Sequence, residues 1–295
     1  MENFIYQKAV SFEGALRLLS AKTQEAKVFA GGTDLLNLMK EKHLTPGILI
    51  DLKGIPGAGG IDYDPREGIT IGGLATIESI GTSAIIRKHF PVIAEAAAVL
   101  GSSQVRHRAT LGGNLCHASP AADMVPSLVA LGAKVGIMGN EGERWILLES
   151  FFVGPGKTLL KETELLTLVR VPPILPGTGC AYLKHGIRQA MDPGIVNVAA
   201  VLTLDAAAEK CLEVRIVLGA VAPVVMRARK AEDWLRGQII NAAAVEEAGR
   251  LASEEARPIT DVRASAEYRR EMAGAITVKC LEQAVKNLPV GRSLP

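Results

Sequence analysis

Two pairs of adjacent glycines constrain the fold of this chain more than any other feature. The first pair lies in Ala30-Gly31-Gly32-Thr33-Asp34, between a strand predicted over residues 27–30 and a helix predicted over 34–42. The second pair lies in Thr110-Leu111-Gly112-Gly113-Asn114, part of a glycine-rich connection predicted over residues 110–115. Paired glycines let the backbone approach a ligand closely and turn its N–H groups toward it, and each segment adds a threonine hydroxyl. Together the segments predict a phosphate site; the alternative is that both are only tight turns.

The order of predicted strands and helices divides the chain into three parts. Residues 1–57 form a small β-α-β unit that ends at a glycine-rich break. Residues 58–175 surround the second glycine pair and close just after Val171-Pro172-Pro173. Residues 176–295 begin with a predicted β-hairpin, with strands over 196–204 and 213–220, and end in helices. This pattern predicts an α+β fold with domains at 1–57, 58–175 and 176–295.

Charge and hydropathy exclude several classes of protein. Lys and Arg number 33 against 31 Asp and Glu, so the formal net charge is +2, and only 4% of residues are aromatic. Nucleic-acid-binding proteins usually carry a concentrated basic excess and stacking aromatic side chains, so we expect no nucleic-acid partner. The longest strongly apolar stretches are about 10 residues, too short to span a bilayer. Because the N-terminus also lacks a signal-peptide pattern, we expect no membrane insertion.

The cysteines are too scattered to suggest a metal site. Cys116, Cys180, Cys211 and Cys280 contain no Cys-x-x-Cys pair. Such usage predicts reduced thiols in a cytoplasmic protein rather than a disulfide framework. It also gives no local ligand set for an iron–sulfur cluster or a structural zinc, so we predict no metal site on this chain.

A Rossmann-type dinucleotide site is an alternative that fails on context. Gly57-Ala58-Gly59 follows a strand predicted over 48–52 and offers the first two glycines of Gly-x-Gly-x-x-Gly. Position 62 is Asp, however, and Tyr63-Asp64-Pro65 cannot open the helix that this fingerprint requires.

Three polar side chains, His117, Ser119 and Asp123, stand out in the small, apolar segment after the second glycine pair. A nucleophilic pair of Cys116 and His117 is disfavoured, because adjacent side chains usually point apart and no orienting acid is identifiable. A packed Cys116 is favoured instead. Asp123 has two interpretations: a cap for the helix predicted through Leu131, or an acceptor for a ribityl or ribose hydroxyl.

The combined pattern resembles the FAD-binding (medium) subunit of the molybdenum hydroxylases. The match rests on Ala30-Gly31-Gly32-Thr33-Asp34, and on the second glycine segment followed by His117-Ala118-Ser119-Pro120-Ala121-Ala122-Asp123. Gln104-Val105-Arg106 and Ile71-Gly72-Gly73-Leu74-Ala75-Thr76 also match, and the resemblance covers most of the chain. That family includes the medium subunit of carbon monoxide dehydrogenase and the flavin domain of xanthine dehydrogenase. One departure is His107, where the family often has Asn.

The resemblance implies a two-subdomain FAD-binding fold of the PCMH/vanillyl-alcohol-oxidase type. Residues 1–57 and 58–175 would be the FAD-binding subdomains, and 176–295 a C-terminal α+β domain over the flavin. The glycine segments would bind the pyrophosphate through backbone N–H groups. His117 would lie near the flavin or ribityl chain, Asp123 would accept from a hydroxyl, Leu166 would touch the adenine or flavin, and Lys184 would lie at the flavin's polar edge. The remaining implied contacts are Lys27, Val28, Phe29, Ala30, Gly31, Gly32, Thr33, Asp34, Thr110, Leu111, Gly112, Gly113 and Asn114.

The family's function is electron transfer within a larger oxidoreductase. The resemblance implies that this chain carries FAD and takes single electrons from iron–sulfur clusters on a small partner subunit. It implies that electron pairs pass on to NAD+ or another acceptor, and that substrate is oxidised at a molybdenum cofactor on a large partner subunit. No catalytic residue on this chain is implied. A lysine such as Lys184 has a second interpretation, as a solvated surface residue.

Two other functions stay open at this point. One is a stand-alone FAD-dependent reductase related to the cell-wall sugar-nucleotide reductases, which would need an acid and a substrate pocket that the sequence does not reveal. The other is a structural subunit of the same fold that has lost FAD, which the intact glycine pairs Gly31-Gly32 and Gly112-Gly113 oppose.

Overall fold

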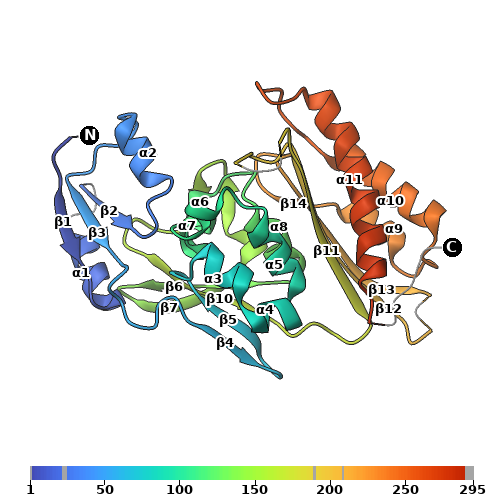
Figure 1. Ribbon diagram of the computed structural model, residues 1–295, viewed down its shortest axis with the longest axis horizontal. Coiled ribbons are helices and arrows are strands. Elements are labelled where there is room, and N and C mark those ends of the chain that lie inside the picture. Colours follow the sequence, from blue (N-terminus) through green and yellow to red (C-terminus); the bar gives the residue numbers. More distant parts are fainter. Residues whose placement is uncertain (1, 22–24, 189–190, 208, 290–295) are drawn as a thin grey trace.

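Three main β-sheets follow one another along the long axis of the molecule, each built from a separate stretch of chain (Figure 1). The structure, a computed structural model, describes residues 2–21, 25–188, 191–207 and 209–289. Helices lie between the second and third sheets and on the outer side of the third sheet.

The first sheet is small and parallel, with the order β1-β3-β2. Its strands are β1 (Ile5–Lys8), β3 (Ile48–Asp51) and β2 (Ala26–Phe29), and helix α1 (Phe12–Ala21) connects β1 to β2. The carboxyl ends of parallel strands meet at one edge of a sheet, where open α/β sheets bind their ligands. The first glycine segment leaves β2 at this edge and leads into the short helix α2 (Leu35–Lys40).

The second sheet is antiparallel, with the order β4-β5-β10-β6-β7. Its strands are β4 (Ile61–Asp64), β5 (Gly68–Gly72), β6 (Lys134–Gly139), β7 (Gly142–Leu147) and β10 (Leu165–Val171). Alternate apolar residues of the three central strands form one core with the helices that cover the sheet. These helices are α3 (Ile77–Thr82), α4 (Ala84–His89), α5 (Pro91–Ala98), α6 (Ser103–Arg106), α7 (Leu111–His117) and α8 (Met124–Ala130). A turn η1 (Leu148–Ser150) and a hairpin of β8 (Phe152–Gly154) and β9 (Lys157–Thr158) precede β10.

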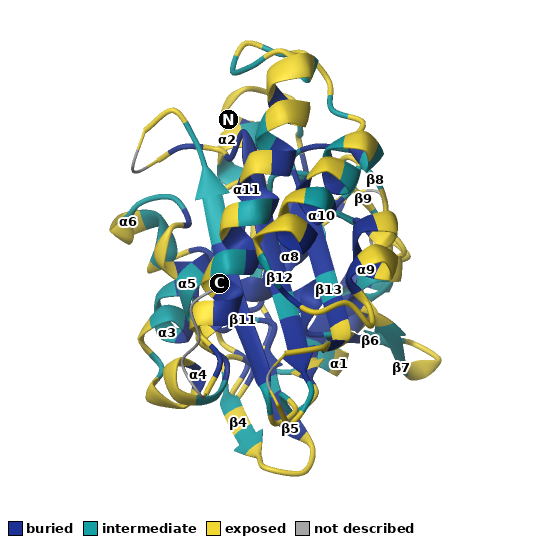
Figure 2. Cartoon of the chain, turned by 90° about the vertical axis from the view of Figure 1, so that its right-hand side faces the viewer, coloured by how far each residue is buried: buried dark blue, intermediate teal, exposed yellow. Residues whose placement is uncertain are grey.

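The third sheet is packed between two sets of helices. Its antiparallel strands are β11 (Thr178–His185), β12 (Val196–Leu204), β13 (Cys211–Gly219) and β14 (Met226–Arg227). Helices α5 and α8 pack on its inner side, and α11 packs on β11 and β12 from outside. Figure 2 shows the buried strands behind outer helices whose outward residues are exposed. The outer helices are α9 (Arg229–Leu235), α10 (Ala242–Glu255) and α11 (Ala266–Lys286).

The structure confirms the predicted α+β class and the hairpin of β12 and β13. The helix predicted over 34–42 is shorter than expected, because the chain turns into the left-handed region at Lys42, with φ +60°. The sheets span residues 5–51, 61–171 and 178–227, and the domain limits at 57 and 175 stay predictions. No helix of the described residues is long and apolar enough to cross a membrane.

Candidate cofactor site

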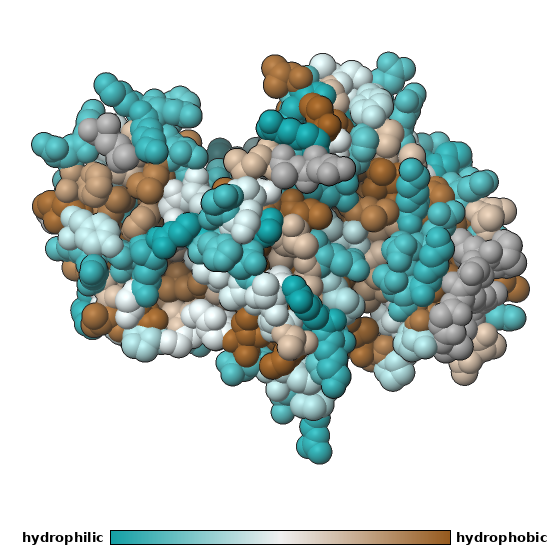
Figure 3. Space-filling model, in the orientation of Figure 1, coloured by the Kyte–Doolittle hydropathy of each residue, from teal (hydrophilic) through white to brown (hydrophobic). Residues whose placement is uncertain are grey.

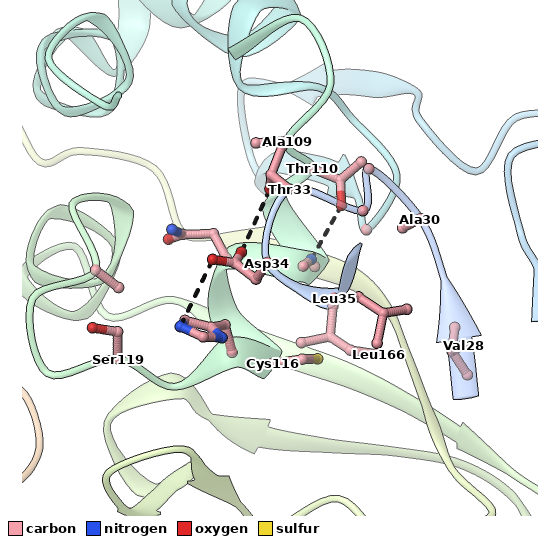
Figure 4. Close-up of a pocket in the computed structure, with 18 of the residues that line it drawn as sticks. Val28, Ala30, Thr33, Asp34, Leu35, Ala109, Thr110, Cys116, Ser119 and Leu166 are labelled. Atoms are coloured by element: carbon pink, nitrogen blue, oxygen red, sulfur yellow. Dashed lines mark hydrogen bonds and ion pairs between the residues drawn. The ribbon is translucent and has the colours of Figure 1, made fainter. Parts of the chain in front are cut away.

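A cavity of about 880 Å³ lies where the first sheet's carboxyl edge meets the second sheet and its helices. Pockets of this size are typical of cofactors and other small molecules. Figure 3 shows a notch in the surface between the N-terminal region and the rest of the molecule. Figure 4 shows Val28, Ala30, Cys116 and Leu166 among the residues around the pocket. The wall is therefore built from segments far apart in the sequence.

Most residues that the resemblance implies lie in the wall of this cavity. Phe29, Leu111 and Lys184 do not. The implied residues that do lie in the wall are Lys27, Val28, Ala30, Gly31, Gly32, Thr33, Asp34, Thr110, Gly112, Gly113, Asn114, His117, Asp123 and Leu166.

The first glycine segment offers backbone donors to the cavity. No hydrogen bond joins the N–H groups of Gly31, Gly32 and Thr33 to any other described residue. Gly32 has φ +76°, a conformation that favours glycine. A Cβ on Gly31 would overlap the carbonyl of Arg108, so both glycines are also required by the chain itself. Consecutive unpaired N–H groups in such a segment form a concavity that binds anions.

The second glycine segment does not offer the free backbone N–H groups that the resemblance implies for a pyrophosphate. It is the first turn of α7 rather than a connection, with Thr110 as the N-cap. The N–H groups of residues 111, 112, 113 and 114 donate to Ala75 O, Gly73 O, Thr110 Oγ1 and Thr110 O, respectively, at 2.8–3.1 Å. The segment is thus bound to the chain before α3, and those four N–H groups have partners already. Only its side chains are left for a ligand.

Two residues of α7, Asn114 and His117, lie in the cavity wall. The amide oxygen of Asn114 is buried and has no hydrogen-bond partner among the described residues. His117 Nε2 lies 3.8 Å from Asp34 Oδ1 and connects the two segments (Figure 4). A buried acceptor without a partner costs stability unless a ligand or water donates to it, so Asn114 marks a point where a donor is needed.

Asp123 does not cap α8, because its side chain accepts no bond from the helix. Instead the carboxylate turns to the third sheet. Its Oδ1 accepts from the Tyr182 hydroxyl at 3.0 Å, and its Oδ2 accepts from Lys184 Nζ at 2.9 Å. Burial raises the pKa of Asp123, and the Lys184 ammonium opposes that rise. The capping interpretation was therefore wrong, and the acceptor interpretation remains a prediction.

Lys184 is neither a surface lysine nor a residue of the cavity wall. Its side chain is 10% exposed and bonds Val99 O, at 3.2 Å, as well as Asp123. Because the side chain is largely buried and bonded, the interpretation of a solvated lysine was wrong. The bond to Asp123 connects Lys184 to the cavity wall. Sequence separation hides this pair, because its members are 61 positions apart along the chain.

Cys116 lies in the wall, and burial raises the pKa of its thiol to about 12. The thiol is therefore protonated at neutral pH and is no nucleophile. The described cysteines are all free, and no group of three metal-binding side chains occurs among the described residues.

The sequence alone did not indicate some residues of the cavity wall, nor two residues that contact the first glycine segment from outside the wall. Met191, Asp192 and Pro193, between β11 and β12, line the cavity without any sequence signal beyond the turn residues at 192–194. Outside the wall, Asp51 is the last residue of β3 and Lys53 lies in the turn after it, at the sheet edge that carries the first glycine segment. Only the parallel order of the first sheet could have indicated their place.

Comparison with known proteins defines the class. The family described as "FAD binding domain in molybdopterin dehydrogenase" matches residues 2–174, and "CO dehydrogenase flavoprotein C-terminal domain" matches residues 181–284. The carbon monoxide dehydrogenase medium chain of Hydrogenophaga pseudoflava is 32% identical over 95% of this chain and 96% of its own. The xanthine dehydrogenase FAD-binding subunit of Escherichia coli O157:H7 is 29% identical, over 95% of each chain.

Solved structures agree with the sequence matches. A carbon monoxide dehydrogenase from Hydrogenophaga pseudoflava superimposes with a TM-score of 0.93 at 32% identity, covering 97% of this chain and 99% of that one. Quinoline 2-oxidoreductase from Pseudomonas putida 86 gives a TM-score of 0.90 at 28% identity, with coverage of 97% and 98%. This chain belongs to the family of FAD-binding medium subunits of the molybdenum hydroxylases. The predicted family, fold, oxidoreductase class and FAD-binding domain are thereby confirmed.

The cavity fits FAD by its own chemistry. The unpaired N–H groups of Gly31, Gly32 and Thr33 suit a pyrophosphate. The buried Asn114 oxygen suits a donor such as a hydroxyl or ring N–H. The apolar side chains of Val28, Leu35 and Leu166 give the rest of the wall a surface for a ring system.

Proposed function

We propose that this chain is the electron-transfer subunit of a three-subunit molybdenum hydroxylase. In this proposal it takes single electrons from iron–sulfur clusters of a small partner subunit and passes pairs to NAD+ or another acceptor. A large partner subunit holds the molybdenum cofactor, and the assembly works in the cytoplasm. Support comes from full-length similarity to proteins named as medium chains or FAD-binding subunits.

The single observation that carries the proposal is the set of unpaired donors in the first glycine segment. We assign the pyrophosphate of FAD to the N–H groups of Gly31, Gly32 and Thr33, because these donors lack other partners among the described residues and line the cavity. Lys27 adds a positive charge to the same wall. A diphosphate offers several anionic oxygens to these donors, and bonds to ionised acceptors are stronger than bonds to neutral ones.

Side chains of the second glycine segment and of α8 would hold the rest of the cofactor. Asn114 would accept through its buried oxygen, and Asp123 would accept from a ribityl or ribose hydroxyl through the lone pairs that Tyr182 and Lys184 leave. His117 would lie beside the ribityl chain, and Leu166 would contact a ring. When bound, FAD supplies the exchange between single electrons and electron pairs, and the protein orients it.

Two alternatives predict different compositions of the purified protein. A stand-alone reductase would turn over without a partner, and a structural subunit would carry no flavin. The similarity to medium chains along 95% of the sequence favours a subunit, and the donors of the first glycine segment favour flavin.

The test is to purify the native complex under mild conditions through a tag on this chain. We expect FAD, identified by chromatography of the extracted cofactor, together with iron, molybdenum and two further subunits at equal stoichiometry. Addition of NAD+ to the substrate-reduced complex shows whether NAD+ is the acceptor. Recovery of FMN alone, or full turnover of a substrate by this chain without partners, would contradict the proposal.

A further inference from the structure

Four side chains form a cluster outside the cavity wall, next to the first glycine segment. Tyr6 comes from β1, Phe29 from the end of β2, Asp51 from the end of β3, and Lys53 from the turn after β3. The parallel order β1-β3-β2 brings these three strands side by side, with Phe29 and Asp51 paired in register. None of the four side chains lines the cavity.

Lys53 is the centre of this cluster. Its Nζ donates to Asp51 Oδ1 at 2.6 Å and to the carbonyl of Ala30 at 3.2 Å. The same ammonium lies 3.6 Å from the centroid of the Phe29 ring, within the range of a cation–π interaction. Lys53 therefore contacts the strand end and the first peptide of the glycine segment at once.

Asp51 fixes the position of the Lys53 ammonium. The Asp51 side chain is 4% exposed, and its second oxygen accepts a hydrogen bond from the Tyr6 hydroxyl. Burial opposes ionisation of this carboxyl, but the hydrogen bonds from Lys53 and Tyr6 outweigh burial and lower its pKa. A buried carboxylate with two donors holds its partners in one geometry, because leaving it without them is costly.

The bond to Ala30 determines where the next N–H group points. The C=O and N–H of a trans peptide point in opposite directions. When Lys53 holds the Ala30 carbonyl, the N–H of Gly31 is turned away from Lys53. The Phe29 ring adds a second constraint, because it lies where a Cβ on Gly32 would be. Ring and ammonium thus support two successive residues of the segment.

We infer that Lys53, held by Asp51 and Tyr6, is a positioning residue for the FAD pyrophosphate. It acts by pinning the Ala30–Gly31 peptide and the Phe29 ring, so that the donors of Gly31 and Gly32 are in place before the cofactor arrives. This inference rests on the proposed place of the pyrophosphate. Preorganised donors bind an anion more tightly because their ordering cost is met on folding.

The test compares two flavins that differ in the phosphates. Apo-protein is titrated with FAD and with riboflavin, which lacks the pyrophosphate, by quenching of flavin fluorescence. Lys53→Met removes both hydrogen bonds while keeping the length of the side chain. We expect FAD affinity to fall about tenfold or more, as for the loss of a charge-assisted hydrogen bond, and riboflavin affinity to stay within about twofold. Lys40→Met, at the exposed end of α2, is the matched control and should change neither.

A second measurement separates positioning from general loss of structure. Tyr6→Phe should weaken FAD binding less than Lys53→Met, and should add nothing in the Lys53→Met background, because Tyr6 acts through Asp51 on Lys53. Lys53→Arg should restore most of the affinity. Unchanged FAD affinity in Lys53→Met, an equal loss for FAD and riboflavin, or additive effects of the two variants would overturn the inference. Wild-type protein that binds riboflavin as tightly as FAD would instead contradict the proposed place of the pyrophosphate.

Discussion

Asp123 shows at the scale of one residue how a buried charge can serve both the fold and a ligand. Its carboxylate lies in the cavity wall and is bonded to Tyr182 and Lys184 of the third sheet. Asn197 donates to the same tyrosine hydroxyl at 3.2 Å, so the network continues into β12. These bonds fix the relative positions of the elements that they join, although Asn197 Oδ1 has no partner among the described residues.

The first prediction concerns the pH dependence of FAD binding. Burial raises the pKa of Asp123, and only the ionised form accepts a ligand hydroxyl through both oxygens. FAD affinity should therefore be highest above the raised pKa and should fall as the pH drops through it, at a higher pH than for an ordinary carboxyl. Asp123→Asn should lower the affinity by roughly ten- to a hundredfold and remove this pH step. Titration of apo-protein with FAD across the acidic range measures both.

The control for Asp123→Asn is needed because that change leaves Lys184 buried without its partner. The double variant Asp123→Asn, Lys184→Met removes both charges and keeps an amide oxygen at position 123. If its FAD affinity equals that of the wild type, the carboxylate has no ligand role, and Asp123 serves only to hold the second and third sheets together.

The second prediction compares Gly32, in the first glycine segment, with Gly57, which has a similar backbone conformation. Both have positive φ, +76° and +72°, but a Cβ would meet Phe29 at position 32 and nothing within 4 Å at position 57. Gly57→Ala should cost about 1 kcal/mol of unfolding free energy from backbone strain alone. Gly32→Ala should cost more, and should also weaken FAD binding, because Phe29 must move. Urea unfolding of the apo-proteins measures the loss in unfolding free energy for each variant. Equal losses for Gly32→Ala and Gly57→Ala would contradict the prediction, because they would mean that the Phe29 ring moves aside without cost.

At the scale of elements, α11 holds the third sheet to the loops around it through one buried arginine. Arg269 is 2% exposed and donates to the carbonyls of Ile195 and Ala220 and to Asp261. Ala220 in turn donates to Pro120 O at 2.7 Å, next to the wall residues Ser119 and Asp123. A single side chain thus joins the helix to three connecting segments, and the one that ends at Ile195 contributes residues 191–193 to the cavity wall.

The third prediction follows from that arrangement. Arg269→Leu leaves the carbonyls of Ile195 and Ala220 without this donor, whereas Asp261 keeps its bonds from Arg263. It should therefore cost about 3 kcal/mol of unfolding free energy, mainly from the two carbonyls. Arg270→Leu, one residue further on the exposed side of the same helix, should change stability by less than about 0.5 kcal/mol. Chemical denaturation of both variants provides the comparison, and similar midpoints for the two would show that the buried bonds contribute little.

Elements were predictable where local pattern decides, and not where distant contacts decide. The hairpin of β12 and β13 and the long helix α11 show in their apolar patterns and turn residues. The second glycine pair was expected in a connection but begins α7, because Gly73 and Ala75 accept its N–H groups. Likewise, most residues that the motifs implied lie in the cavity wall, although their role toward FAD stays a prediction. The places of Lys53 and of the Lys184 pair depend instead on the strand order of the first sheet and on contacts with the third sheet.

At the scale of the whole molecule, the cavity lies across a junction between unequal parts. The first sheet has its own small core, and that core includes Leu165 of the second sheet. The second and third sheets have larger cores and share the helices α5 and α8. With fewer buried apolar contacts, the first sheet is expected to open at lower free energy than the rest of the apo-protein.

The last prediction is that FAD stabilises the first sheet more than the others. Ligand that binds only the closed form adds about 2.7 kcal/mol at a free concentration of 100 Kd. Since the wall draws on the glycine segment after β2 as well as on α7, opening of the first sheet must release the cofactor. Hydrogen exchange with and without FAD should therefore show large added protection in β2 and β3, including amides that do not line the cavity, and little in α10. The wild-type apo-protein should exchange first in β1, β2 and β3. Added protection confined to residues 31–33, or spread equally over all three sheets, would contradict the prediction that FAD stabilises the first sheet more than the others.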